Sequence, residues 1–120
     1  MNDTEIDVSF VMTVYNKSYY LPSVLKALLN QTGVKNPEYI FIDDGSKDNS
    51  VEIIREATKG LPNVQIVVNE KNLGISRNTN KGIALVRGKW TRILDSDDVF
   101  PLDSTEKMLE LASKTKADMI

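Results

Sequence analysis

Three aspartates stand within four positions of the segment Ile93–Phe100 (ILDSDDVF), directly after an apolar run. Carboxylates held this close repel one another, so the crowding predicts a cation or hydrogen-bond donors beside them. In extended backbone Asp95 and Asp97 point to the same side and can reach one hard cation, whereas Ser96 points elsewhere. Because the chain contains no histidine and no cysteine, a metal must be held by oxygen ligands. The segment therefore predicts a Mg²⁺ or Mn²⁺ site with open positions for phosphate oxygens.

Short polar segments follow the other apolar runs as well: Tyr15–Asn16, Asp43–Asp44 and Asn72–Gly74. The carboxyl ends of parallel strands meet at one edge of a sheet, and ligands bind there near the point where the strand order reverses. We therefore expect these segments to lie beside Asp95–Asp98. Asp43-Asp44-Gly45-Ser46 is also a good turn without any ligand, and Tyr15 could simply close the edge of the core. The aspartate cluster is harder to explain structurally, since a helix cap accounts for one acid and not three.

The elements that must position these residues alternate between strand and helix patterns. Apolar, β-branched runs predict strands at 8–14, 38–42, 64–68 and 90–94, and the beginning of a fifth at 117–120. Apolar residues at helical spacing predict helices over 21–29, 51–57, 75–86 and 108–112, although Gly82 weakens the third pattern. This alternation calls for right-handed crossovers and a mainly parallel sheet. Residues 1–120 are thus expected to form a single α/β domain, a three-layer α/β/α sandwich.

Composition narrows the classes of function. The 120 residues are 41% hydrophobic and 27% charged, enough for one modest core. A formal net charge of -2, without a basic block, argues against nucleic-acid binding. The chain has no apolar run of membrane-spanning length, and its acidic start, Met1–Glu5, lacks the features of a signal peptide. The sequence therefore predicts a cytoplasmic location and no membrane span.

Four segments, in order, resemble the amino-terminal part of family 2 glycosyltransferases, which have the GT-A (Rossmann-like) fold. They cover nearly the whole chain: Val8–Lys17, Phe41–Asp48, Asn72–Asn78 and Gly88–Asp98. The last of them looks like the DXD region of the family. Thr13 stands where many members carry proline, a change the family tolerates. The resemblance implies a truncated GT-A domain that contains the donor nucleotide-binding part.

The resemblance also implies roles for single residues. Tyr15 matches the residue that packs on the nucleotide base, with Thr13 beneath it, and Asp44 matches the acid that accepts the N3 hydrogen of uracil. Asp97 matches the metal ligand, and Asp95 matches a residue that contacts ribose or, through water, the metal. Asp98 is expected to support these two. The other residues expected near the nucleotide are Asp43, which orients the turn, Asn72, Gly74, Ser96 and Arg77, for which solvated charge is the ordinary explanation.

The implied reaction is the metal-dependent, inverting transfer of a sugar from a nucleotide-diphospho-sugar to an acceptor hydroxyl. UDP-sugars are favoured, although Asp44 would suit the imide of thymine as well. The usual setting is the synthesis of cell-surface polysaccharide or lipopolysaccharide, with a glycan or lipid-linked acceptor, at the inner face of a membrane with which the full-length protein could associate peripherally. Relatives carry the catalytic base well downstream of the DXD region, so the base is expected beyond Ile120. The chain is then expected to bind the donor but not to transfer the sugar.

Other classes of protein fit the residues less well. Asp95-x-Asp97-x-Val99 superficially resembles the D-x-D-x-T/V motif of haloacid-dehalogenase-like phosphatases, but that motif normally follows the first strand. The acidic pair Asp43–Asp44 suggests a receiver domain, yet a receiver's acidic pair ends its first strand, which here ends in Thr13-Val14-Tyr15. A non-catalytic nucleotide-sugar-binding module of a larger protein remains an open alternative.

Overall fold

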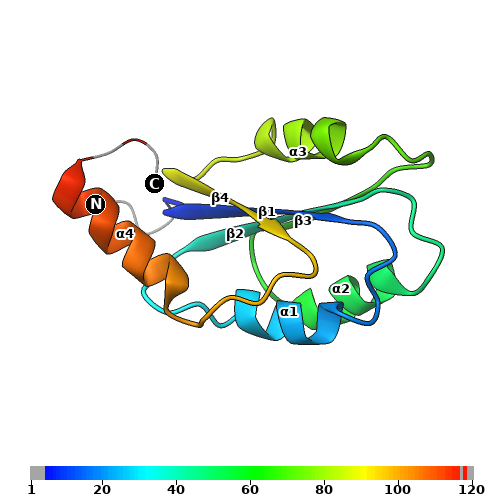
Figure 1. The fold of residues 1–120 in the computed structure, drawn as a ribbon, viewed down its shortest axis with the longest axis horizontal. Coiled ribbons are helices and arrows are strands. Elements are labelled where there is room, and N and C mark those ends of the chain that lie inside the picture. Colours follow the sequence, from blue (N-terminus) through cyan, green and yellow to red (C-terminus); the bar gives the residue numbers. More distant parts are fainter. Residues whose placement is uncertain (1–4, 117, 119–120) are drawn as a thin grey trace.

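The computed structural model describes residues 5–116 and 118, in which four strands alternate with four helices (Figure 1). The strands are β1 (Val8–Val14), β2 (Pro37–Asp43), β3 (Val64–Val68) and β4 (Trp90–Asp95). The helices are α1 (Leu21–Leu28), α2 (Ser50–Thr58), α3 (Ile75–Ile83) and α4 (Ser104–Thr115). This order confirms the predicted alternation. Apart from Asp118, the expected fifth strand at 117–120 lies outside the described residues. None of the described helices combines the length and apolar character needed to cross a membrane.

The four strands form one parallel sheet in the order β3-β2-β1-β4. The chain moves outward from β1 to β2 and β3, and then returns to place β4 on the other side of β1, so the strand order reverses between β1 and β4. In this register Val14 lies opposite Asp43, and Thr13 lies opposite Asp95. The polar segments after β1, β2 and β4 therefore meet at one edge of the sheet.

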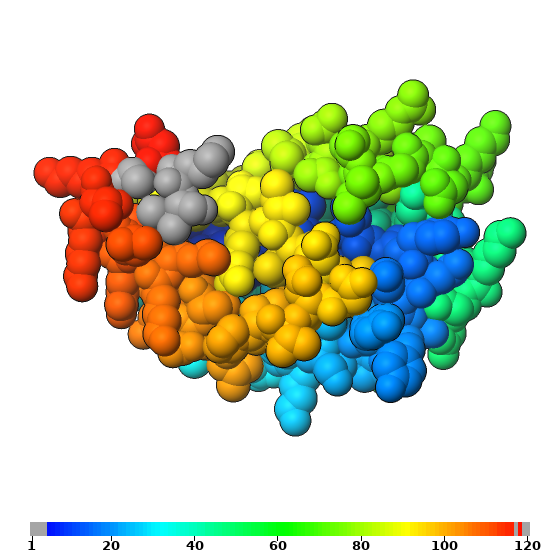
Figure 2. Space-filling view, viewed as in Figure 1, coloured from blue at the N-terminus to red at the C-terminus, as the bar shows by residue number. Residues whose placement is uncertain are grey.

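Helices cover both faces of the sheet, which confirms the three-layer α/β/α prediction (Figure 1). Helix α3 lies on one face, and α1 and α2 lie on the other. The side chains of β1 alternate between two cores: Phe10, Met12 and Val14 pack in the larger core with α1, and Val11 packs in a smaller core on the α3 side. Burial on both faces is typical of a central parallel strand. Strand β4 forms the edge of the sheet, and its side chains (yellow) reach the surface in Figure 2.

Gly82 is explained by close packing between α3 and the sheet. A Cβ atom at this position would overlap Cγ1 of Val11 and lie 3.6 Å from Cγ1 of Ile42. Only a residue without a side chain allows the helix to approach β1 and β2 so closely. The helix ends at Ile83, earlier than the predicted 86, because the amide of Leu85 donates back to the Gly82 carbonyl, three residues earlier, in a tighter turn.

A buried carboxylate stabilises the amino ends of the strands, which lie opposite the polar segments. Glu38, at the start of β2, is fully buried and accepts hydrogen bonds from the Ser9 hydroxyl (2.6 Å), the Arg87 amide (2.8 Å) and Arg87 Nε (2.9 Å). The amide of Gly88 donates to the same Ser9 hydroxyl (2.8 Å). These bonds fix the segment between α3 and β4, and so the point at which β4 enters the sheet.

Candidate functional site

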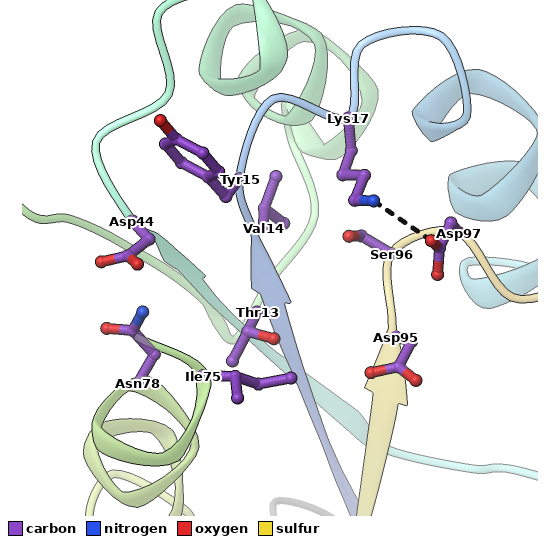
Figure 3. A pocket seen from close by; sticks show the side chains of 10 residues that line it. All are labelled: Thr13, Val14, Tyr15, Lys17, Asp44, Ile75, Asn78, Asp95, Ser96 and Asp97. Carbon is purple, nitrogen blue, oxygen red and sulfur yellow. Dashed lines mark hydrogen bonds and ion pairs between the residues drawn. The ribbon is translucent and has the colours of Figure 1, made fainter. Parts of the chain in front are cut away.

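A cavity of about 310 Å³ opens at the edge where β1, β2 and β4 end (Figure 3). It lies at the reversal of strand order beside β1, where a parallel sheet is expected to bind ligands. Its walls come from the end of β1 and the following loop, the loop after β2, the start of α3 and the end of β4. The residues that line it are Thr13, Val14, Tyr15, Lys17, Asp44, Ile75, Asn78, Asp95, Ser96 and Asp97.

Six of the residues expected from the sequence line this cavity: Thr13, Tyr15, Asp44, Asp95, Ser96 and Asp97. Five others do not line it: Asp43, Asn72, Gly74, Arg77 and Asp98. Sequence reasoning assigned no role at the site to the four further lining residues, Val14, Lys17, Ile75 and Asn78. Ile75 and Asn78 are three positions apart on α3 and therefore share one helix face, a spacing that could have identified them. Lys17 lies two residues beyond Tyr15, but the sequence alone does not show where that loop directs its side chain.

Asp43 belongs to the turn beside the cavity. Its side chain is fully buried, and its carboxylate accepts hydrogen bonds from the Gly45 amide (3.1 Å), the Ser46 amide (2.8 Å) and the Ser46 hydroxyl (2.6 Å). Gly45 has a φ of 80°, which side chains rarely adopt. Asp43 thus fixes the turn, as expected, while Asp44 reaches the cavity.

Asp44 holds the loop that leads into α3. One carboxylate oxygen accepts hydrogen bonds from the Leu73 amide (2.7 Å) and the Asn69 side chain (3.1 Å), and the other accepts from the Gly74 amide (3.1 Å). The Asn78 side chain is a further donor. Burial alone would raise the pKa of this carboxyl group, but the four hydrogen bonds outweigh burial and lower the pKa to about 2. Asp44 is therefore ionised at neutral pH, and Asn72 and Gly74 belong to the loop it stabilises.

Tyr15 lies near Asp44, on the side of the cavity away from Asp97 (Figure 3). Its side chain is 41% exposed, although β1 ends in buried residues immediately before it. An aromatic ring that is half free of the core offers a flat surface for stacking. Tyr15 and Asp44 together thus present an apolar face and a hydrogen-bond acceptor at one end of the cavity.

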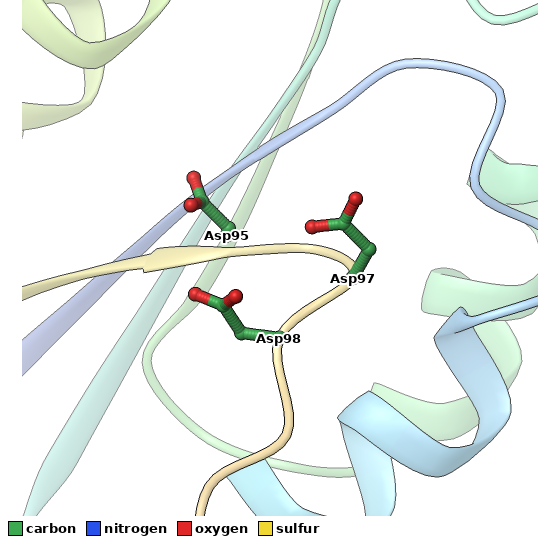
Figure 4. Close-up of side chains that lie close together, drawn as sticks. All are labelled: Asp95, Asp97 and Asp98. Carbon is green, nitrogen blue, oxygen red and sulfur yellow. The ribbon is translucent and has the colours of Figure 1, made fainter.

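Asp95, Asp97 and Asp98 form an acidic cluster at the other end. Each offers a carboxylate oxygen, and these three atoms all lie within 4.8 Å of one another (Figure 4). The chain turns after β4, with the Asp98 amide donating to the Asp95 carbonyl (3.3 Å), and this turn brings Asp98 back toward Asp95. Ser96, which lies between Asp95 and Asp97 in the sequence, is buried and lines the cavity. All donors are hard carboxylate oxygens, which fit Mg²⁺ or Mn²⁺ and are unsuited to softer metals.

Lys17 brings the only positive charge among the described residues that line the cavity. Its Nζ atom donates to Oδ2 of Asp97 over 3.1 Å, the dashed line in Figure 3. The ion pair joins the loop after β1 to the turn after β4. One carboxylate of the acidic cluster is thereby neutralised within the protein.

Similarity to known proteins identifies the family. Residues 9–120 match the model for "Glycosyl transferase family 2". The chain belongs to glycosyl transferase family 2. Among curated relatives, EpsH from Bacillus subtilis is 39% identical over 105 residues, which are 88% of this chain and 30% of EpsH. The chain therefore spans about a third of that relative's length.

Solved structures confirm the GT-A fold. Staphylococcus aureus TarS 1-349 in complex with UDP superposes with a TM-score of 0.85 at 23% identity, covering 94% of this chain and 34% of that one. The mannosyltransferase PcManGT from Pyrobaculum calidifontis, in complex with GDP-Man and Mn²⁺, gives a TM-score of 0.78 at 20% identity, covering 95% of this chain and 33% of that one. The expected family and fold are thus confirmed.

Proposed function

We propose that this chain forms the donor-binding part of a glycosyltransferase that uses a nucleotide-diphospho-sugar, with a UDP-sugar favoured. The observation that carries the proposal is one cavity with a stacking surface and an acceptor at one end and two carboxylates of the acidic cluster, Asp95 and Asp97, at the other, with Asp98 beside them. A nucleoside diphosphate has a matching arrangement of groups, with a flat base at one end and phosphates that bind a metal ion at the other. The complexes of TarS with UDP and of PcManGT with GDP-Man and Mn²⁺ support this assignment.

At the base end, Tyr15 stacks on the ring of the nucleobase and Asp44 accepts its imide hydrogen. Uracil presents an N–H donor at N3, whereas cytosine presents an acceptor there, and an ionised carboxylate rejects an acceptor. Since the pKa of Asp44 is about 2, this discrimination holds throughout the neutral range. The hydrogen bonds that Asp44 makes to the loop before α3 also hold its carboxylate in place for the base.

At the phosphate end, Asp97 and Asp95 hold the divalent metal, with Asp98 close enough to join or support them. A Mg²⁺ or Mn²⁺ ion bound there supplies Lewis-acid stabilisation of the negative charge on the departing diphosphate. Thr13 and Ser96 place hydroxyl groups on the wall between the two ends of the cavity, where ribose would lie. We assign Asp95, which pairs with Thr13 in the sheet register, a contact to the same ribose.

The family resemblance supports an inverting transfer to a hydroxyl of a glycan or lipid-linked acceptor, in the synthesis of cell-surface polysaccharide at the cytoplasmic side of a membrane. We assign no residue of this chain to the deprotonation of the acceptor. The chain's own contribution is to bind the donor, orient its diphosphate and hold the metal. A non-catalytic donor-binding module would share these properties and would differ only in the absence of transfer.

Calorimetric titration of the 120-residue chain with UDP, GDP and TDP, each with and without Mn²⁺, tests the proposal. We expect UDP to bind only with Mn²⁺, and Asp97→Asn to weaken that binding at least about tenfold, because the negative charge of one metal ligand is lost. Glu110→Gln, at an exposed position on α4 outside the cavity, is the matched control and should bind as the wild type does. If a chain shown to be folded by circular dichroism binds none of the three nucleotides, the proposal is wrong.

A further inference from the structure

We propose that Lys17 is a charge-exchange residue of the donor site: a divalent cation displaces its ammonium group from Asp97, and the freed ammonium then binds the phosphate oxygens of the nucleoside diphosphate. This inference rests on the proposed function. It adds a residue and an order of events that neither the family match nor the sequence assigns to the site.

The ion pair between Lys17 and Asp97 is weak enough for a competing cation to break it. The distance from Nζ to Oδ2 is 3.1 Å, and the two side chains are 31% and 45% exposed. Ion pairs at this exposure contribute little to stability because water screens them and both side chains lose conformational freedom. A divalent cation has twice the charge of the ammonium and can be bound by two or three carboxylates of the cluster at once. It therefore competes with Lys17 for the Asp97 carboxylate.

The backbone of Lys17 is fixed by several hydrogen bonds, whereas its ammonium group is held by one, to Asp97. Its amide donates to the Ser50 hydroxyl (2.9 Å) at the start of α2, and its carbonyl accepts from the Tyr20 and Leu21 amides (both 3.0 Å) at the start of α1. The preceding Asn16, at a φ of 50°, directs the chain into this turn. Beyond the Asp97 contact, the ammonium lies 5.6 Å from the centre of the exposed Tyr20 ring. A firmly held backbone with a long flexible side chain lets the ammonium move within the cavity without moving the loop.

The charge of the cavity explains why the freed ammonium turns to phosphate. Three carboxylates line the cavity, those of Asp44, Asp95 and Asp97, against the single ammonium of Lys17. Before a metal binds, this surplus of negative charge repels a diphosphate. The cavity carries a net charge of -2 with Lys17 included, and a divalent cation offsets it. Lys17 then no longer has Asp97 to itself, and the diphosphate is the anion that its ammonium meets. Lysine is well suited to phosphate oxygens because its ammonium donates hydrogen bonds in three directions.

Other basic side chains near this edge are less well placed. Lys81 donates to Oδ1 of Asn69 (2.6 Å), inside the network around Asp44, and Arg77 is exposed on α3 outside the cavity lining. Lys17 instead stands between the base end, where Tyr15 lies, and the acidic cluster (Figure 3). A diphosphate bound between a base and a metal at these two ends passes within reach of its side chain.

Lys17→Met tests the exchange, since it removes the charge and keeps an unbranched side chain of similar size. Two affinities are measured by calorimetry: Mn²⁺ alone, and UDP at saturating Mn²⁺. We expect the variant to bind Mn²⁺ alone about 3- to 10-fold more tightly, because the competing ammonium is gone, and UDP about 10-fold more weakly, because a phosphate ligand is lost. Uridine, which has no phosphate, should bind the variant and the wild type equally.

Lys47→Met, at an exposed lysine of the neighbouring loop outside the cavity, is the matched control and should change neither affinity. A static structural bridge would lower the unfolding midpoint of Lys17→Met and leave Mn²⁺ affinity unchanged or weaker. Either affinity change without the other overturns the exchange. If the wild type binds UDP with Mn²⁺ but Lys17→Met behaves like the control, the inference is wrong and the proposed function stands. If the wild type does not bind UDP at all, both are wrong.

Discussion

The Asp44 carboxylate shows how one side chain can stabilise a loop and be held ready for a ligand. Its oxygens accept hydrogen bonds from the Leu73 and Gly74 amides, which would otherwise be left without partners beside a buried polar network. Asn69 and Asn78 complete that network, in which the Asn69 amide group donates a 2.6 Å hydrogen bond to Oδ1 of Asn78. The side chain is only 5% exposed, so few orientations are open to it. The hydrogen bonds from the loop thus hold the Asp44 carboxylate in one orientation, in which it can recognise a base.

Asp44→Asn should therefore reduce both stability and nucleotide binding. The amide group of asparagine would place a donor against protein donors. Because the folded pKa of about 2 lies below the ordinary value of 3.8, the ionised carboxylate stabilises the fold above pH 4, and this contribution is lost as the pH falls through about 2. We expect a loss on the order of 1 to 2 kcal/mol in the free energy of unfolding at pH 7. Urea unfolding of both proteins between pH 7 and pH 3 measures it.

The difference between the two proteins should shrink below about pH 4, since the unfolded wild type then takes up a proton on Asp44 while the folded form stays ionised. Glu110→Gln, on an exposed face of α4, controls for the loss of one negative charge. A difference that stays constant down to pH 3 would show that the stabilisation does not come from the ionised carboxylate.

At the scale of elements, the strands and helices could be predicted because each leaves a periodic apolar pattern. Val8–Val14 and Pro37–Asp43 are buried along almost their whole length, and the matching runs in the sequence are almost uninterrupted. The end of α3 was missed because Leu85 and Val86 are apolar for a different reason: they pack on the smaller core from a tight turn beyond the helix. An apolar residue in the sequence indicates that the position is buried, not that it is helical. The apolar pattern therefore continues past the end of the helix when the following residues are also buried.

The site was predictable to the extent that strand ends determine it. Thr13, Tyr15 and Asp95 reach the cavity because parallel strands end at one edge, a consequence of topology that the sequence reveals. Lys17 depends on the direction of a loop that turns at Asn16 through a positive φ, which no periodicity records. Arg77 and Asn78 are neighbours on α3, yet only Asn78 lines the cavity, because the packing of the helix decides which face turns inward.

Gly82→Ala should destabilise the fold although alanine favours a helix by about 1 kcal/mol over glycine. The new methyl group would overlap Cγ1 of Val11 in the smaller core, and overpacking of this kind costs about 1 to 3 kcal/mol before the helical gain. Urea unfolding measures the net loss, with Asn80→Ala on the exposed face of α3 as the control. The double variant Gly82→Ala with Val11→Ala should lose less than the sum of the single variants, because Val11→Ala makes room for the methyl group. Additive losses would place the cost somewhere other than this contact.

At the scale of the whole molecule, the carboxyl ends and the amino ends of the strands have separate functions. The cavity and its charges lie at the carboxyl edge, while Glu38 fastens β1, β2 and the entry into β4 at the opposite edge. Glu38 and Asp43 are five residues apart along β2, roughly 17 Å at the rise of a parallel strand. The position of Asp95 against Thr13 nevertheless depends on the register of β4, which the Glu38 network sets at the other end.

The unequal burial of Glu38 and Arg87 predicts different costs for replacing the two partners of their ion pair. Glu38 is fully buried, whereas the Arg87 side chain is 57% exposed. Burial alone would raise the pKa of Glu38, but the Ser9 hydroxyl and the Arg87 donors outweigh it and hold the pKa below its ordinary value. Glu38→Gln places an amide donor among these donors and should cost on the order of 2 to 4 kcal/mol in unfolding free energy. Arg87→Ala keeps its own amide hydrogen bond and should cost less than about 1 kcal/mol.

Urea unfolding gives both free energies, and calorimetry in the folded range gives the affinity for UDP with Mn²⁺. The affinity should be unchanged in Arg87→Ala, because the Arg87 amide still donates to Glu38 and the Ser9 hydroxyl still holds Gly88, so β4 keeps its register. Equal losses of stability from the two variants would show that the guanidinium, rather than the Ser9 hydroxyl and the Arg87 amide, fixes this edge. A large loss of UDP affinity in Arg87→Ala, with its stability kept, would show instead that the two edges of the sheet are coupled and that the charge at one end positions the carboxylates at the other.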